Sequence, residues 1–220
     1  MVRGKKLLLF KLLISFLLLA AATSVWAYPF EVGDVITLHN GPGTTNGGEF
    51  IIKENGTVIH NTFCLEKQET FSYGQELTIE SISDYATAGG GGATAGMDYI
   101  SVQTRYLYYH FFIGDLQYYD YNNAVLREQD ANELQRAIWM LEGEISVAGN
   151  YFIDLVEQVK SEPTSNWTAG IDRVKVLNLI KSDGSNAQDQ LTVVPEPGTL
   201  LSLGVVLLGL GGITRRRFKN

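Results

Sequence analysis

Two hydrophobic segments, one at each end, limit how much of this chain can fold in water. At the N-terminus, residues 1–27 run from a basic start through the apolar stretch 12–22 to small residues around Trp26. That order is typical of a secretory signal peptide, and the apolar stretch is shorter than the ~20 residues that span a bilayer. We therefore expect the mature chain to begin near Tyr28, outside the cytoplasm.

The C-terminal end has three features in a fixed order. The tripeptide Pro195-Glu196-Pro197 comes first, an apolar run follows at 200–213, and a basic cluster ends the chain at 215–219. Cations that follow a hydrophobic segment stay on the cytoplasmic side of a membrane, so the body of the protein is expected outside. Because the run is short for a membrane span, it indicates a sorting segment that anchors the protein transiently in the inner membrane.

These three features resemble the PEP-CTERM sorting signal of Gram-negative bacteria. The resemblance implies processing by an exosortase-type membrane peptidase and a final location on the outer surface or in the extracellular matrix. It covers only the tail, so we divide the chain into a signal peptide (1–27), one extracellular domain (28–193) and a sorting and membrane segment (194–220).

The net charge of the chain between its two ends limits the kinds of molecule that it can bind. Eight of the 17 basic residues lie in the two ends, which leaves 9 basic against 23 acidic residues between them. Such an acidic surface repels phosphate groups, so nucleic acid is excluded as a partner. We interpret the acidity as a means of keeping an exported protein soluble.

Turn residues and hydrophobic periodicity predict an α+β fold. Short strands are expected at 34–39, 49–53, 57–64, 75–82, 173–180 and 190–194, with a tight hairpin turn at Asn55-Gly56. Asp130 and Glu133 have the spacing of a capping box, so a helix is expected to start there, and a second helix is expected at 151–160. The aromatic segment 101–113 fits a helix or a strand equally well.

Cys64 is the only cysteine of the chain, so it has no partner for an internal disulfide. Four interpretations remain open: a buried hydrophobe, an intermolecular disulfide, a catalytic thiolate or an acylated thiol. A catalytic thiolate needs a histidine within hydrogen-bond reach. His60 is four residues away on the same expected strand, and His110 would have to approach by tertiary folding. No local sequence signature of a cysteine hydrolase surrounds Cys64.

Gln135 is the residue that best fits an acylated thiol. It lies on the expected helix beside the apolar stripe, and it shares a face with Trp139, four residues later. If the Cys64 thiol attacks the Gln135 amide carbon and ammonia leaves, the product is a thioester. The fold would have to supply proximity, and Trp139 would serve as a lid against water. Glu66 has two equally open interpretations: it orients or polarises the linkage, or it is a solvated charge at the end of the strand.

The segments Phe63-Cys64-Leu65-Glu66 and 134–139 (LQRAIW) resemble the two signature motifs of bacterial Cys-Gln thioester domains. The resemblance implies that Cys64 is the thiol donor, Gln135 the acyl donor and Trp139 the aromatic residue that closes the second motif. It also implies a β-sandwich or barrel-like core with inserted helices. Gln68 also lies near Cys64, but the segment between them lacks the spacing and the glycine of complement-type thioesters.

The function predicted from these features is covalent attachment to an amine-bearing surface or matrix molecule, for adhesion or matrix cross-linking. Such a protein reacts once per molecule and is not an enzyme. A non-reactive β-rich protein of the envelope or polymer matrix is the alternative, and a cysteine hydrolase ranks third. The dispersed histidines and the lack of an EF-hand pattern predict no metal and no cofactor.

Overall fold

The computed structural model describes residues 29–44, 47–87, 96–146, 148–162 and 166–195. The expected signal peptide and the C-terminal apolar helix therefore lie outside the described residues. In chain order the described elements are β1 Val35–Asn40, β2 Phe50–Glu54, β3 Thr57–Thr62, β4 Glu76–Ser83, β5 Tyr85–Ala86, β6 Asp98–Tyr99, α2 Val102–Ile113, α3 Ala124–Leu141, α4 Tyr151–Ser161, the 3-10 turn η1 Ile171–Arg173, β7 Val174–Lys181 and β8 Asn186–Val193.

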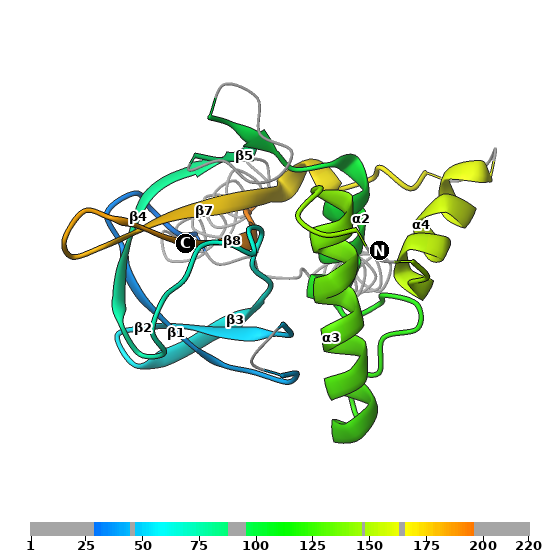
Figure 1. The fold of residues 1–220 in the computed structure, drawn as a ribbon, viewed down its shortest axis with the longest axis horizontal. Coiled ribbons are helices and arrows are strands. Elements are labelled where there is room, and N and C mark those ends of the chain that lie inside the picture. The colour runs from blue at the N-terminus through cyan, green and yellow to red at the C-terminus, as the bar shows by residue number, and fades with distance from the viewer. Residues whose placement is uncertain (1–28, 45–46, 88–95, 147, 163–165, 196–220) are drawn as a thin grey trace, which may run out of the picture.

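The architecture is an antiparallel sheet with three helices inserted between its strands. The sheet has the order β3-β2-β1-β4-β7-β8, and every neighbouring pair is antiparallel. The chain leaves this sheet after β4, forms helices α2, α3 and α4, and returns to the sheet at β7. Figure 1 shows the strands curving around one side of the molecule and the helices gathered on the other. The expected α+β class is confirmed at this level.

The two edges of the sheet meet just after β3. Cys64 forms an antiparallel bridge with Gln190 of β8. On either side, the Leu191 N–H donates to the Phe63 carbonyl at 3.0 Å, and the Leu65 N–H donates to the Asp189 carbonyl at 3.1 Å. These bonds satisfy edge groups that would otherwise be exposed. Cys64 therefore lies in a rigid seam of the sheet.

Local turn chemistry predicts the hairpin correctly. Asn55 and Gly56 have φ angles of 49° and 77°, and they join β2 to β3. Two consecutive positive φ angles define the turn that matches strand twist, which explains the Asn-Gly pair. The ambiguous segment 101–113 is helix α2, whose first turn is capped by the Ser101 side chain.

The expected helix start at the capping box is wrong. Helix α3 begins at Ala124, where the Asn123 side chain accepts hydrogen bonds from the first backbone N–H groups. Asp130 and Glu133 lie inside the helix and bond to other segments instead: Asp130 accepts from the Tyr151 hydroxyl, and Glu133 from Asn150. An asparagine is as good a cap as an aspartate, so the earlier cap allows a longer helix.

Buried apolar residues form two main clusters and a smaller third one. One cluster consists mainly of side chains from the strands of the sheet, among them Ile36, Leu38, Ile52, Leu77 and Ile79. The other joins the helices to β7 and β8. Phe50, Cys64 and Trp139 form a smaller cluster of their own, contributed by the sheet, the seam and α3.

His60 of β3 gives the fold a pH dependence. Its ring lies against Phe30 and Phe112, and neither ring nitrogen has a hydrogen-bond partner among the described residues. Burial lowers the pKa of His60 from 6.5 to about 4. Protonation therefore favours the unfolded chain, so stability present above pH 6.5 is lost as the pH falls towards 4, by up to about 3 kcal/mol.

Urea unfolding at pH 7 and pH 4.5 tests this expectation. The free energy of unfolding of the wild type should fall more steeply between these two pH values than that of His60→Phe, in which nothing at this position titrates. Comparing the two proteins cancels the titration of the carboxylates that they share. Equal slopes in both proteins would contradict the assignment.

Candidate functional site

The structure brings the thiol of Cys64 and the carboxamide of Gln135 into direct contact. The Cys64 thiol donates a hydrogen bond to Gln135 Oε1 at 3.2 Å. The Cys64 backbone N–H donates to the same oxygen at 3.1 Å, and Gln135 Nε2 donates to the Cys64 carbonyl at 2.8 Å. These paired backbone bonds fix which end of the carboxamide is oxygen. The sulfur therefore lies beside the oxygen of an amide group that two backbone hydrogen bonds hold in place.

Both partners are removed from water. Cys64 is 1% exposed and Gln135 is fully buried. Burial, and next the charge of Glu66, raise the pKa of the Cys64 thiol well above its usual range. The thiol is therefore protonated at neutral pH, in agreement with its role as a hydrogen-bond donor.

Helix α3 positions Gln135 from its middle. Leu134 and Ile138 are fully buried on either side of Gln135 and fix the rotation of the helix. A loop from the sheet covers Gln135 from above: a Cβ atom at Gly47 would lie 3.2 Å from Gln135 Cγ and 3.6 Å from the Trp139 ring. A side chain at position 47 would press on the aliphatic part of the Gln135 side chain. The glycine thus allows the loop to close over the site.

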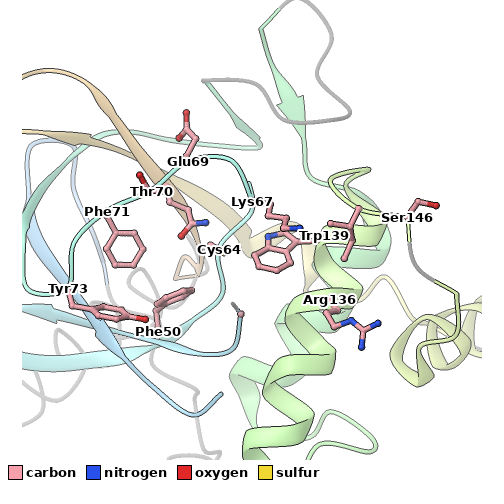
Figure 2. A pocket seen from close by; sticks show the side chains of 13 residues that line it. Phe50, Cys64, Lys67, Glu69, Thr70, Phe71, Tyr73, Arg136, Trp139 and Ser146 are labelled. Atoms are coloured by element: carbon pink, nitrogen blue, oxygen red, sulfur yellow. The ribbon is translucent and has the colours of Figure 1, made fainter. Parts of the chain in front are cut away.

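A pocket of about 810 Å³ opens next to the sulfur. Cys64 lies in its wall, whereas Gln135 lies behind that wall. Figure 2 shows Trp139 and Arg136 of α3 on one side, with Phe50, Phe71 and Tyr73 on the other. The pocket is therefore the route by which a small molecule or an extended side chain would reach the sulfur.

Trp139 packs beside Cys64, where it can shield the thiol from water. It is 6% exposed, it belongs to the same buried cluster as Cys64, and Lys67 Nζ lies 5.9 Å from the centroid of its ring. A cation over the indole face adds attraction to this contact. The segment after Cys64 is held as well, because the Lys67 N–H donates to Glu144 Oε2 at 3.1 Å.

Glu66 is buried two residues after Cys64, and its side chain bonds to β8. It is 1% exposed, and its Oε2 accepts a hydrogen bond from the Asp189 N–H at 3.3 Å. Burial, followed by the charge of Glu69, raises the pKa of Glu66, and burial with the charge of Glu66 raises the pKa of Asp189. Sequence reasoning missed Glu69 and Asp189, because no local pattern links them to Cys64.

The other candidates from the sequence do not join the site. Gln68 is exposed. The ring of His110 bonds to Asp115 at 2.7 Å and lies against Tyr106. Neither ring nitrogen of His60 has a hydrogen-bond partner among the described residues. In the described part of the chain, no histidine is bonded to the Cys64 sulfur, so the geometry gives no support to a Cys-His catalytic pair.

Comparison with known proteins identifies the tail. Residues 193–217 match the PEP-CTERM protein-sorting motif, which confirms the sorting signal predicted there. This is an exported protein with a C-terminal membrane-transit signal that an exosortase-type peptidase processes. No curated protein and no solved structure matches the chain. Within the described ranges, no helix is long and apolar enough to cross a membrane.

Proposed function

We propose that this exported protein forms an internal thioester between Cys64 and Gln135 and uses it to attach covalently to amines on another molecule. The observation that carries the proposal is the contact of the thiol with Gln135 Oε1 at 3.2 Å, in a carboxamide held by two backbone hydrogen bonds. A buried thiol that merely fills space has no need of a clamped amide at its sulfur.

These contacts support the following route to the bond. The sulfur attacks the Gln135 amide carbon, and negative charge develops on Oε1, where the Cys64 N–H already donates at 3.1 Å. A fixed donor at that atom stabilises the tetrahedral intermediate. The carbon-nitrogen bond then breaks, and the amide nitrogen leaves as ammonia with the thiol proton. Holding both groups in place supplies the effective concentration that an unreactive amide requires.

Attachment to an amine takes place at the same carbonyl carbon. An amine that enters the pocket attacks the thioester carbonyl, a new amide forms with Gln135, and the sulfur leaves and takes up a proton. Cys64 and Trp139 line the pocket, so the amine meets the sulfur side of the linkage. Each molecule reacts once, so the protein is an attachment device for the outer surface or the extracellular matrix and does not turn over.

Intact mass spectrometry of the purified exported protein tests this function, with the chain ends sequenced in the same experiment. The wild type should weigh one ammonia less than its sequence, and Cys64→Ala and Gln135→Ala should each restore the full mass. A wild type of full mass, with one thiol that titrates after denaturation, would overturn the proposal. It would favour a non-reactive structural protein of the envelope or matrix, in which Cys64 is only a buried side chain.

A further inference from the structure

Three carboxylates gather beside the Cys64 pocket without taking part in the Cys64-Gln135 contact. One oxygen from each of Glu66, Glu69 and Asp189 lies within 4.8 Å of the other two. Glu66 and Asp189 are only 1% and 2% exposed, whereas Glu69 is half-buried and lines the pocket. The cluster is thus closed on the protein side and reached through the pocket.

In both Glu66 and Asp189, one carboxylate oxygen accepts a backbone hydrogen bond, and the other has no hydrogen-bond partner among the described residues. Glu66 Oε2 accepts from the Asp189 N–H at 3.3 Å, and Asp189 Oδ1 accepts from the Leu179 N–H at 2.7 Å. Glu66 Oε1 and Asp189 Oδ2 are buried without a hydrogen-bond partner in the described part of the chain, as is Glu69 Oε2. A buried acceptor without a partner costs about 1–3 kcal/mol, and the three groups also repel one another when they are ionised.

We propose that Glu66, Glu69 and Asp189 form a binding site for a divalent cation and that Ca²⁺ is the ion that fits it. Calcium binds oxygen ligands at about 2.3–2.6 Å, so three oxygens within 4.8 Å of one another can contact a single ion. Magnesium requires about 2.0–2.1 Å and near-ideal octahedral geometry, and zinc favours nitrogen and sulfur ligands. Water from the pocket completes the coordination shell.

The proposed site differs from the sequence-based prediction of no metal. The sequence could not indicate the site, because its ligands come from two distant segments of the chain. Glu66 and Glu69 follow the seam at Cys64, while Asp189 comes from β8. No single loop carries the ligands, so an EF-hand search cannot find them. The pairing of the Leu65 N–H with the Asp189 carbonyl at 3.1 Å is one of the contacts that bring the two segments together.

Calorimetric titration of CaCl₂ into the purified exported protein, after removal of metal with a chelator, tests the site. We expect saturable binding with a Kd of about 0.1–1 mM, the range of extracellular calcium modules, together with a higher melting temperature. Glu69→Gln and Asp189→Asn should each weaken binding by about tenfold or more, because each removes a ligand charge. Glu128→Gln, an exposed change on α3, should bind calcium as the wild type does.

The proposal is overturned if the wild type shows neither saturable heat nor a change in melting temperature at calcium concentrations on the order of 10 mM. It is also overturned if Glu69→Gln binds as tightly as the wild type. Glu69 is half-buried at the pocket, so that variant keeps its fold even where Asp189→Asn unfolds. Calcium binding should persist in Cys64→Ala, which separates this site from the thioester.

Discussion

Replacing Gln135 with glutamate is expected to abolish methylamine incorporation completely. The wild type should take up one methylamine at Gln135 and release a thiol that reacts with a thiol reagent. A carboxylate offers no ammonia as a leaving group and resists attack by sulfur, so Gln135→Glu cannot form the linkage. The substitution conserves side-chain size, and the Cys64 N–H and thiol keep an oxygen to which they can donate. Intact mass before and after methylamine treatment measures the effect.

Gln68→Glu is the matched control for this experiment. Gln68 is also close to Cys64 in the chain, but it is exposed. It should therefore incorporate methylamine to the same extent as the wild type. Labelling that survives in Gln135→Glu, or is lost in Gln68→Glu, would show that a different glutamine supplies the acyl group.

Replacing Arg127 with alanine is expected to lower the free energy of unfolding by about 3 kcal/mol. Arg127 Nε and Nη2 donate to the two carboxylate oxygens of Glu49 at 2.7 and 2.8 Å, and the Glu49 side chain is fully buried. Without Arg127, the hydrogen bonds that remain to the buried carboxylate within the described ranges are those from Tyr119 and Asn61. Urea unfolding at neutral pH measures the loss.

Two further variants locate the cause. Arg136→Ala removes an ion pair between partly exposed residues of α3, Arg136 and Glu133, and should change stability by less than about 1 kcal/mol. Glu49→Gln in the Arg127→Ala background removes the unpaired charge and should recover part of the loss. If Arg127→Ala and Arg136→Ala are equally mild, the Glu49 ion pair is not what attaches α3 to the sheet.

The ion pair also links stability to the site. Glu49 precedes β2, and Arg127 lies on α3, the helix that carries Gln135. The contact therefore holds the helix against the sheet edge where Cys64 lies. We expect the fraction of Arg127→Ala molecules that lack one ammonia to fall below that of the wild type, because the thiol and the amide are no longer held together.

Local signals in the sequence predicted the parts of the fold that neighbouring residues control. The Asn55-Gly56 hairpin, helix α4 and the strands β1, β4 and β7 lie where turn residues and periodicity indicate. The same local reasoning placed the start of α3 at Asp130. It failed there because Asn123 is an equally good cap that comes earlier in the chain, which leaves Asp130 inside the helix, where it accepts a hydrogen bond from Tyr151.

The sequence by itself determined the sorting tail, the acidic body and the identity of the one thiol and the amide best placed to meet it. The tertiary structure alone decided that Cys64 lies in the seam, that Gln135 reaches it from the middle of α3 and that Asp189 joins Glu66 and Glu69. The physical reason is the distance along the chain over which each kind of interaction acts. Caps, turns and apolar periodicity act between residues a few positions apart, whereas these contacts exist only after the sheet edges have paired and α3 has docked.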